Sequence, residues 1–155
     1  MTEDRTLWGS SKHTYQNDDK ICSLSSSKCS PSKVHNGDKR FPAPGTDGKR
    51  RIRTGDVSNV DLPGPVALFN GTDNVLHHVD DKTLTIFNFT LGDHMLNPGW
   101  VVRQVYIKEN DVYIRTYGEG SGFNIFNVNG NQDIVDAVWS GTNDYIRECI
   151  SASNC

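Results

Sequence analysis

The strongest pattern of hydrophobic and polar positions lies in the second half of the chain, where two strand-like stretches flank a short polar break. Residues 100–107 and 112–117 are rich in β-branched and aromatic side chains, which suit the pleated, half-buried surface of a sheet. Glu109 and Asn110 lie in the middle of this polar break, where the chain would reverse direction. Pro98-Gly99 precedes the two stretches and ends the segment before them, and glycines follow the second stretch. The pattern predicts a β-hairpin around which the fold is organised.

Side-chain alternation gives this hairpin two different faces. With the tip at residues 109–110, Arg103 pairs with Thr116 on a face that is otherwise apolar. A guanidinium cannot lose its charge, so Arg103 needs either an anionic partner inside the protein or an anionic ligand in a cleft. The sequence leaves both explanations open. The opposite face is aromatic and has its own cation, Arg115; its rings are those of Trp100, Tyr106, Tyr113 and Tyr117.

The segments around the hairpin predict further strands and then helices. Strands are expected at residues 66–69, 74–79, 83–91 and 123–128. A helix is expected from residue 131 to 139, with Gly141 breaking it and Thr142 capping a second short helix. Strands followed by helices predict an α+β fold, in which an antiparallel sheet with a central hairpin carries C-terminal helices on one face.

Residues 1–56 are rich in Ser, Pro, Gly and charge, with few large apolar residues to offset the entropy of ordering. We therefore expect an extended or disordered arm over 1–56 and a globular domain over 57–155. The net charge of −3 indicates no strong preference for polyanions, although residues 48–53 form a short basic cluster. No run is long and apolar enough for a membrane span, and residues 1–20 contain no hydrophobic segment of the kind found in a Sec signal peptide.

The four cysteines form two close pairs, Cys22 with Cys29 and Cys149 with Cys155 in sequence. An even count predicts disulfides, which would staple the two ends of the chain if they paired across it. Three connectivities are open, and free thiols in a reducing cytosol are the alternative. The spacings do not match a zinc site, so we expect no metal and no cofactor.

Two histidine-containing segments are candidates for chemistry. His77 and His78 precede Asp80 and Asp81, but neighbouring residues of a strand face opposite ways, so only one histidine can enter a given cleft. Asp93-His94 lies in a predicted loop just before the hairpin, where a histidine can act as a general acid or base. Each histidine can equally be an ordinary surface or structural residue.

With these residues identified, the chain resembles the C-terminal effector modules of bacterial polymorphic toxins. The resemblance rests on DHMLNPGWVVR (93–103), VYIRTYGEG (112–120) and VWSG (138–141), within about residues 75–148. Many such modules are small α+β ribonucleases. The resemblance implies an antibacterial toxin, delivered by a specialised secretion system, that cleaves RNA without a metal and is neutralised by a cognate immunity protein. We further expect a monomer.

The resemblance also implies roles for individual residues. His94 would be the general acid or base, Arg103 the phosphate clamp, and Thr116 and Tyr117 the positioning hydroxyls. From the residues themselves we also expect a substrate-binding set: Asp93, Arg115, Gly118, Gly120 and His78.

Two alternatives to the ribonuclease follow from the same residues. A toxin could instead hydrolyse NAD⁺, whose pyrophosphate also suits Arg103 and the glycine-rich segment. In the other, the chain is a non-catalytic secreted binding module stapled by disulfides. Arg103 would then belong to a core ion pair, and the aromatic face of the hairpin would contact the partner.

Overall fold

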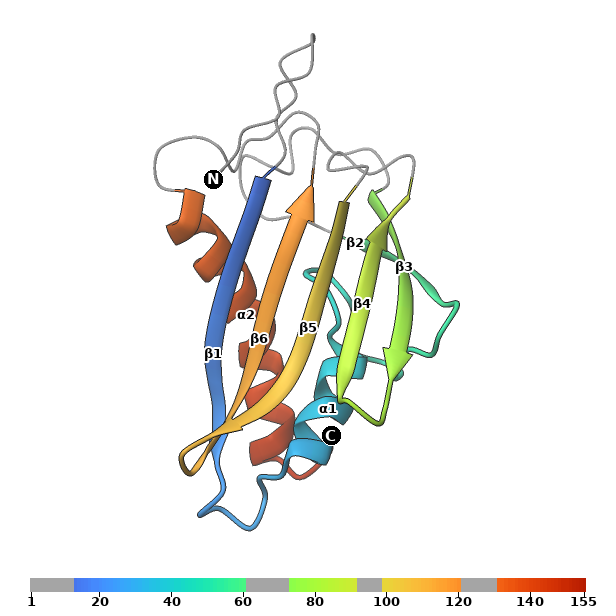
Figure 1. The fold of residues 1–155 in the computed structure, drawn as a ribbon. Coiled ribbons are helices and arrows are strands. Elements are labelled where there is room, and N and C mark those ends of the chain that lie inside the picture. Colours follow the sequence, from blue (N-terminus) through green and yellow to red (C-terminus); the bar gives the residue numbers. More distant parts are fainter. Residues whose placement is uncertain (1–12, 61–72, 92–98, 121–130) are drawn as a thin grey trace, which may run out of the picture.

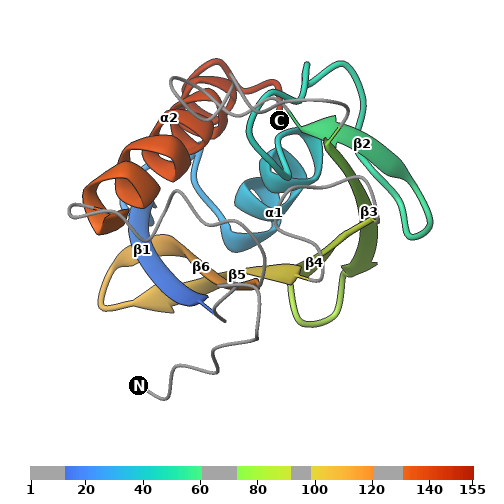
Figure 2. The ribbon, with the colours of Figure 1, turned by 90° about the horizontal axis from the view of Figure 1, so that it is seen from above.

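The computed structural model describes residues 13–60, 73–91, 99–120 and 131–155 and contains one antiparallel sheet with two helices. Six strands lie in the order β1-β6-β5-β4-β3-β2. Both helices cover the same face of this sheet (Figures 1 and 2). The elements are β1 (His13–Ser23), α1 (Pro31–Arg40), β2 (Val57–Val60), β3 (Asp73–Asp80), β4 (Thr85–Thr90), β5 (Gly99–Lys108), β6 (Asp111–Gly120) and α2 (Asn131–Ser151). The predicted α+β class is confirmed.

The central hairpin forms with the register that the sequence predicts. β5 and β6 turn at Glu109 and Asn110, and Arg103 lies opposite Thr116 in the ladder. Glu109 has a φ of 57°, as one residue of so short a reversal often requires. The strands predicted at 74–79 and 83–91 correspond to β3 and β4. Those predicted at 66–69 and 123–128 lie outside the described residues.

Most of the segment expected to be an arm belongs to the fold. β1 pairs with β6 along nearly its whole length, and α1 packs beside α2 on one face of the sheet, against β4 and β5. α1 begins at Ser30, whose Oγ accepts a hydrogen bond from the Lys33 amide at 3.2 Å, and Pro31 follows as its first residue. The expectation of an extended arm was therefore wrong for residues 13–56. The segment has few apolar residues of its own, and the pairing of β1 with β6 and the packing of α1 provide the contacts that order it.

The C-terminal segment is one helix, not two. α2 continues through Gly141, which is exposed and tolerated at a cost of about 1 kcal/mol. Its buried residues recur every three or four positions and form one stripe: Trp139, Thr142, Asn143, Ile146, Cys149 and Ile150. Packing of this stripe outweighs the local effect of one glycine.

The hydrophobic core lies toward the turn end of the hairpin, between the sheet and both helices. It comprises Ile21, Cys29, Val34, Val105, Val112, Ile114, Ile146 and Ile150. The disulfides Cys22–Cys29 and Cys149–Cys155 border this core, and each closes a short loop within one end of the chain. The expected disulfides are thus present, and neither joins the two ends. In the part of the chain described, neither helix is sufficiently long and apolar to cross a membrane.

Candidate functional site

Arg103 projects from β5 into the space between the sheet and the helices, and its side chain is fully buried. Each of its three nitrogens donates a hydrogen bond within the chain. Nε donates to Asp38 Oδ1 at 2.7 Å, Nη1 to Thr116 Oγ1 at 3.2 Å and Nη2 to Asn143 Oδ1 at 2.7 Å. The guanidinium also lies over the Trp139 ring, 4.7 Å from its centroid. One side chain therefore connects both helices and two strands.

Asp38 is the anionic partner of Arg103 and comes from α1. Its carboxylate is fully buried, and its second oxygen, Oδ2, has no hydrogen-bond partner. Burial raises the pKa of Asp38 above its usual range, while the charge of Arg103 and the hydrogen bond from it oppose that rise. The sequence left two explanations for Arg103, an anionic partner inside the protein or an anionic ligand in a cleft. The structure is consistent with the first, a core ion pair with Asp38.

The polar network continues from Asn143 to the surface of the sheet edge. Asn143 Nδ2 donates to Asp19 Oδ2 on β1 at 3.0 Å, and Arg147 Nη2 donates to Asp19 Oδ1 at 2.5 Å. Arg147 also reaches the Lys20 carbonyl. Through these bonds the network joins α1, β5, α2 and β1.

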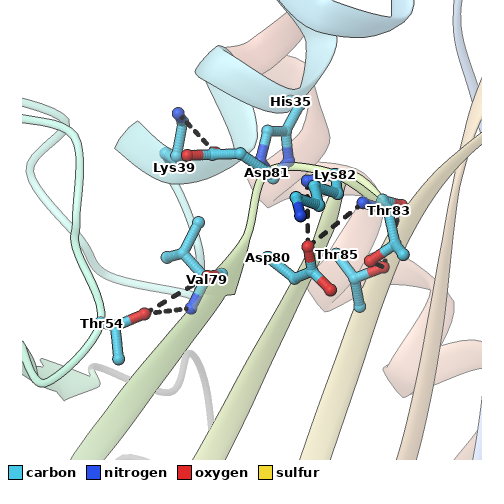
Figure 3. Close-up of polar contacts among 9 residues, drawn as sticks. All are labelled: His35, Lys39, Thr54, Val79, Asp80, Asp81, Lys82, Thr83 and Thr85. Atoms are coloured by element: carbon cyan, nitrogen blue, oxygen red, sulfur yellow. Dashed lines mark hydrogen bonds and ion pairs between the residues drawn. The ribbon is translucent and has the colours of Figure 1, made fainter.

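α1 is attached to the sheet at a second point, the turn after β3 (Figure 3). Asp81 Oδ1 lies 3.0 Å from Lys39 Nζ and 2.9 Å from His35 Nε2. The hydrogen bond from Lys39, and then that from His35, lowers the pKa of the Asp81 carboxyl. His35 is almost completely buried, and its Nδ1 has no hydrogen-bond partner. Asp38 and His35 therefore hold the same helix to two different parts of the sheet.

His77 is a buried residue of the sheet interior. Its Nδ1 lies 2.6 Å from Asn88 Oδ1, and its Nε2 lies 2.7 Å from Ser58 Oγ. The amide oxygen of Asn88 can only accept, so Nδ1 carries the proton and Ser58 donates to Nε2. Burial lowers the pKa of His77, against the opposing effect of Asn88. His77 is thus a satisfied neutral histidine.

The remaining candidate residues separate onto opposite faces of the sheet. Thr116 is buried on the inner face, whereas Tyr117 lies on the outer face beside Trp100, with ring centroids 5.4 Å apart. Arg115 is also on the outer face, where Nε donates to Asp18 Oδ1 at 2.7 Å. His78 lies outward beside Phe87. Because neighbouring strand residues alternate, Thr116 and Tyr117 cannot serve one shared site as expected.

The two candidate glycines have different positions. Gly118 faces Tyr15 of β1 so closely that a Cβ there would lie 2.2 Å from the tyrosine ring. Gly118 is therefore required for packing of the Tyr15 ring, and a substrate-binding role is not needed to explain it. Gly120 is the last residue of β6 and pairs with Gly99 and His13. Asp93 and His94 lie outside the described residues, so the predicted proximity of His94 to Arg103 stays a prediction.

Sequence reasoning placed Thr116 opposite Arg103 but missed the two other partners of the guanidinium, Asp38 and Asn143. Asp38 lay in the presumed arm, and Asn143 lay just past the presumed helix break. The Ser30-Pro31 pair was an available signal for α1, since serine at the cap and proline at the first position commonly begin a helix. Over the ranges that the structure describes, no group of three or more His, Cys, Asp or Glu is placed to hold a metal ion.

Comparisons with known proteins add information on the fold. No family model and no curated protein sequence matches the chain. Several solved structures are similar. Ara h 8.0201 has a TM-score of 0.55 and 14% identity, covering 91% of this chain and 99% of that one. The protein XoxI from Bacillus cereus has a TM-score of 0.53 and 12% identity, covering 88% and 94%. The Aha1 dimer from Colwellia psychrerythraea has a TM-score of 0.50 and 10% identity, covering 90% and 95%. At these identities the likenesses concern the fold alone, which this chain shares with the three structures.

Proposed function

We propose that this chain is a non-catalytic, disulfide-braced module that acts by binding protein in an oxidising environment. The observation that carries the proposal is the position of Arg103. A phosphate clamp must present its donors to a ligand, whereas every nitrogen of this guanidinium already donates inside the fold. Asp38 neutralises its charge, so little attraction remains for a second anion.

Two further observations support binding. Both disulfides fit a compartment in which thiols are oxidised, such as the outside of a cell. The outer face of the sheet is rich in aromatic side chains, and aromatic residues are enriched where proteins contact one another. Together these features match the binding-module alternative more closely than the ribonuclease.

The test combines expression in a bacterial host with assays of the purified protein, with disulfides intact. We expect unimpaired growth, intact tRNA and rRNA in EDTA and in Mg²⁺, and unchanged NAD⁺. Degradation of RNA or NAD⁺ that is lost in His94→Ala, at an unchanged urea midpoint of unfolding, would overturn the proposal. Arg103→Met is not a clean catalytic test, because its side chain holds the fold together.

A second candidate, the effector toxin with its immunity partner, is favoured by one specific observation. The described parts of the three stretches that carry the sequence resemblance lie close together in the fold. Arg103 of the first lies opposite Thr116 of the second, and Trp139 of the third covers the Arg103 guanidinium. A toxin of this kind predicts growth arrest on cytoplasmic expression and rescue by a co-expressed neutralising protein. Growth arrest without RNA or NAD⁺ loss would leave the toxin with a different target.

A further inference from the structure

The loop between α1 and β2 carries a basic segment that the aromatic face of the sheet does not include. Lys49, Arg50, Arg51 and Arg53 lie within five consecutive residues, and all four are exposed. Ile52, the remaining residue of this run, is buried. The segment therefore divides into one apolar anchor and four charged side chains that reach solvent. We call these four residues the basic segment.

The backbone that carries the basic segment is fixed at both ends and in the middle. At its start, Arg40 Nε donates to the Gly48 carbonyl at 2.8 Å. In the middle, the Ile52 amide donates to a carbonyl in the last turn of α1 at 2.8 Å. At its end, the Arg53 amide donates to Asp56 Oδ2 at 2.8 Å, and the Asp56 amide returns a bond to the Arg53 carbonyl. A loop that is already ordered loses little conformational entropy when it binds a ligand.

The side chains of the basic segment contribute little to the fold. In the part of the chain that the structure describes, the guanidinium groups of Arg50, Arg51 and Arg53 take part in no hydrogen bond or ion pair. Lys49 lies 3.8 Å from Asp47, but both side chains are largely exposed, and such a pair stabilises a protein only slightly. The fold therefore uses the backbone and Ile52 and leaves four cations accessible.

Acids near the basic segment already have hydrogen-bond donors. Four of them lie in the loop and in the adjacent turn after β3, each accepting hydrogen bonds within the chain: Asp47, Asp56, Asp80 and Asp81. Lys39 and His35, outside the basic segment, bind Asp81 (Figure 3). Residues 47–56 carry four cations and two acids, whereas the whole chain has a net charge of −3. Positive charge is thus concentrated locally, which favours an anionic partner.

The residue types indicate which anions fit. A guanidinium presents a planar set of donors that matches the oxygens of a sulfate or phosphate group, and short runs rich in Lys and Arg are typical of surfaces that bind nucleic acid or heparin. Residues 45–56 contain no aromatic side chain on which a base could stack, and the Phe41 ring beside Gly48 already stacks on Tyr145. Both disulfides fit an oxidising compartment such as the cell surface, where sulfated polysaccharides are found. These two observations favour the polysaccharide over nucleic acid.

We propose that the basic segment binds a sulfated polysaccharide of the heparin type. This inference goes beyond the proposed function, because it adds a second surface with a carbohydrate partner. If all four cations contact sulfate groups, counterion release should weaken binding about 50- to 150-fold between 50 and 200 mM NaCl. The expected dissociation constant at physiological salt is about 1–100 μM, the range of sequence-independent polyanion binding.

Isothermal titration calorimetry with a heparin-derived oligosaccharide tests the proposal, on the full chain with both disulfides intact. The triple variant Arg50→Gln/Arg51→Gln/Arg53→Gln should raise the dissociation constant about tenfold or more and reduce its dependence on salt. The matched control removes the same charge from exposed lysines outside the loop, as Lys28→Gln/Lys33→Gln/Lys108→Gln. It should bind as the wild type does. The urea midpoint of unfolding checks that both triple variants are folded.

A folded wild-type protein that does not bind the oligosaccharide in 50 mM NaCl overturns the proposal. Equal losses in the two triple variants would show that net charge, and not the basic segment, is responsible. Desulfated heparin that binds as tightly, or a single-stranded DNA oligonucleotide of similar length that binds more tightly, would rule out a sulfated polysaccharide as the partner. Failure here is distinct from failure of the proposed function, which the RNA and NAD⁺ assays decide.

Discussion

The buried pair of Arg103 and Asp38 gives the most demanding prediction. Asp38→Asn keeps the size of the side chain but leaves the guanidinium without a counter-charge. Removing one member of a buried ion pair costs about 3–5 kcal/mol, because the remaining charge stays desolvated. Since an average domain is stable by only about 5–15 kcal/mol, Asp38→Asn is expected to bring the protein close to unfolding.

Arg103→Met should be less damaging than Asp38→Asn, and its effect should depend on pH. A stranded carboxylate can bind a proton, whereas a stranded guanidinium cannot release one. Burial already raises the pKa of Asp38, and the variant removes the cation that opposes this rise. A raised carboxyl pKa contributes stability that is fully present below the unfolded pKa and is lost as pH rises through the folded pKa. Arg103→Met should therefore regain stability relative to the wild type as pH falls.

The double variant Asp38→Asn/Arg103→Met completes the cycle. It removes both charges and loses the hydrogen bonds to Thr116 and Asn143, at about 1 kcal/mol each. We expect a coupling energy of about 2–4 kcal/mol between the two sites, measured as shifts in the urea midpoint at constant m-value under non-reducing conditions. Additive effects, or single substitutions that each cost less than about 1 kcal/mol, would refute the assignment of Arg103 to a structural ion pair.

Three other properties follow from the packing. A Cβ on Gly37 would lie 2.8 Å from Ile146 Cγ2, so Gly37→Ala should lower stability by about 1–2 kcal/mol, whereas Gly141→Ala, with nothing within 4 Å, should raise it by about 0.5–1 kcal/mol in the same urea titration. Because burial lowers the pKa of His77, stability should fall as pH drops below the unfolded value of 6.5, and His77→Gln should flatten that dependence in thermal melts from pH 7 to about 5. Reduction of the two disulfides, with sequence separations of 7 and 6, should cost about 2–2.5 kcal/mol each, and an unchanged urea midpoint after reduction would contradict this.

The sequence was most informative where local pattern and tertiary environment agree. Alternation of apolar residues defined the hairpin, its tip and the opposition of Arg103 to Thr116, because the period of a strand directly specifies which side chains share a face. It also placed Arg103 on the apolar side and thereby limited the explanations to a buried partner or a ligand. The choice between a buried partner and a ligand required the position of Asp38, which is far from Arg103 in the sequence.

Composition was misleading for the first third of the chain. The turn-rich segment around Cys22 and Cys29 has few apolar residues, yet the few it has enter the core together with the disulfide. Val34 and Asp38 lie on the buried side of α1, which a short helix with a polar composition does not reveal by itself. Ordering of such a segment depends on contacts with β6 and α2, which no local window contains.

The sequence by itself determined the strand periodicity, the hairpin register, the α+β class and the need of Arg103 for an anion. Only the tertiary structure decided that this anion is Asp38, that Thr116 and Tyr117 serve different faces, and that each disulfide stays within one end of the chain. The physical reason is the sequence separation over which each kind of interaction acts. Alternation and turn chemistry act over a few residues, whereas the partner of a buried charge is chosen by the packing of elements that lie 65 residues apart.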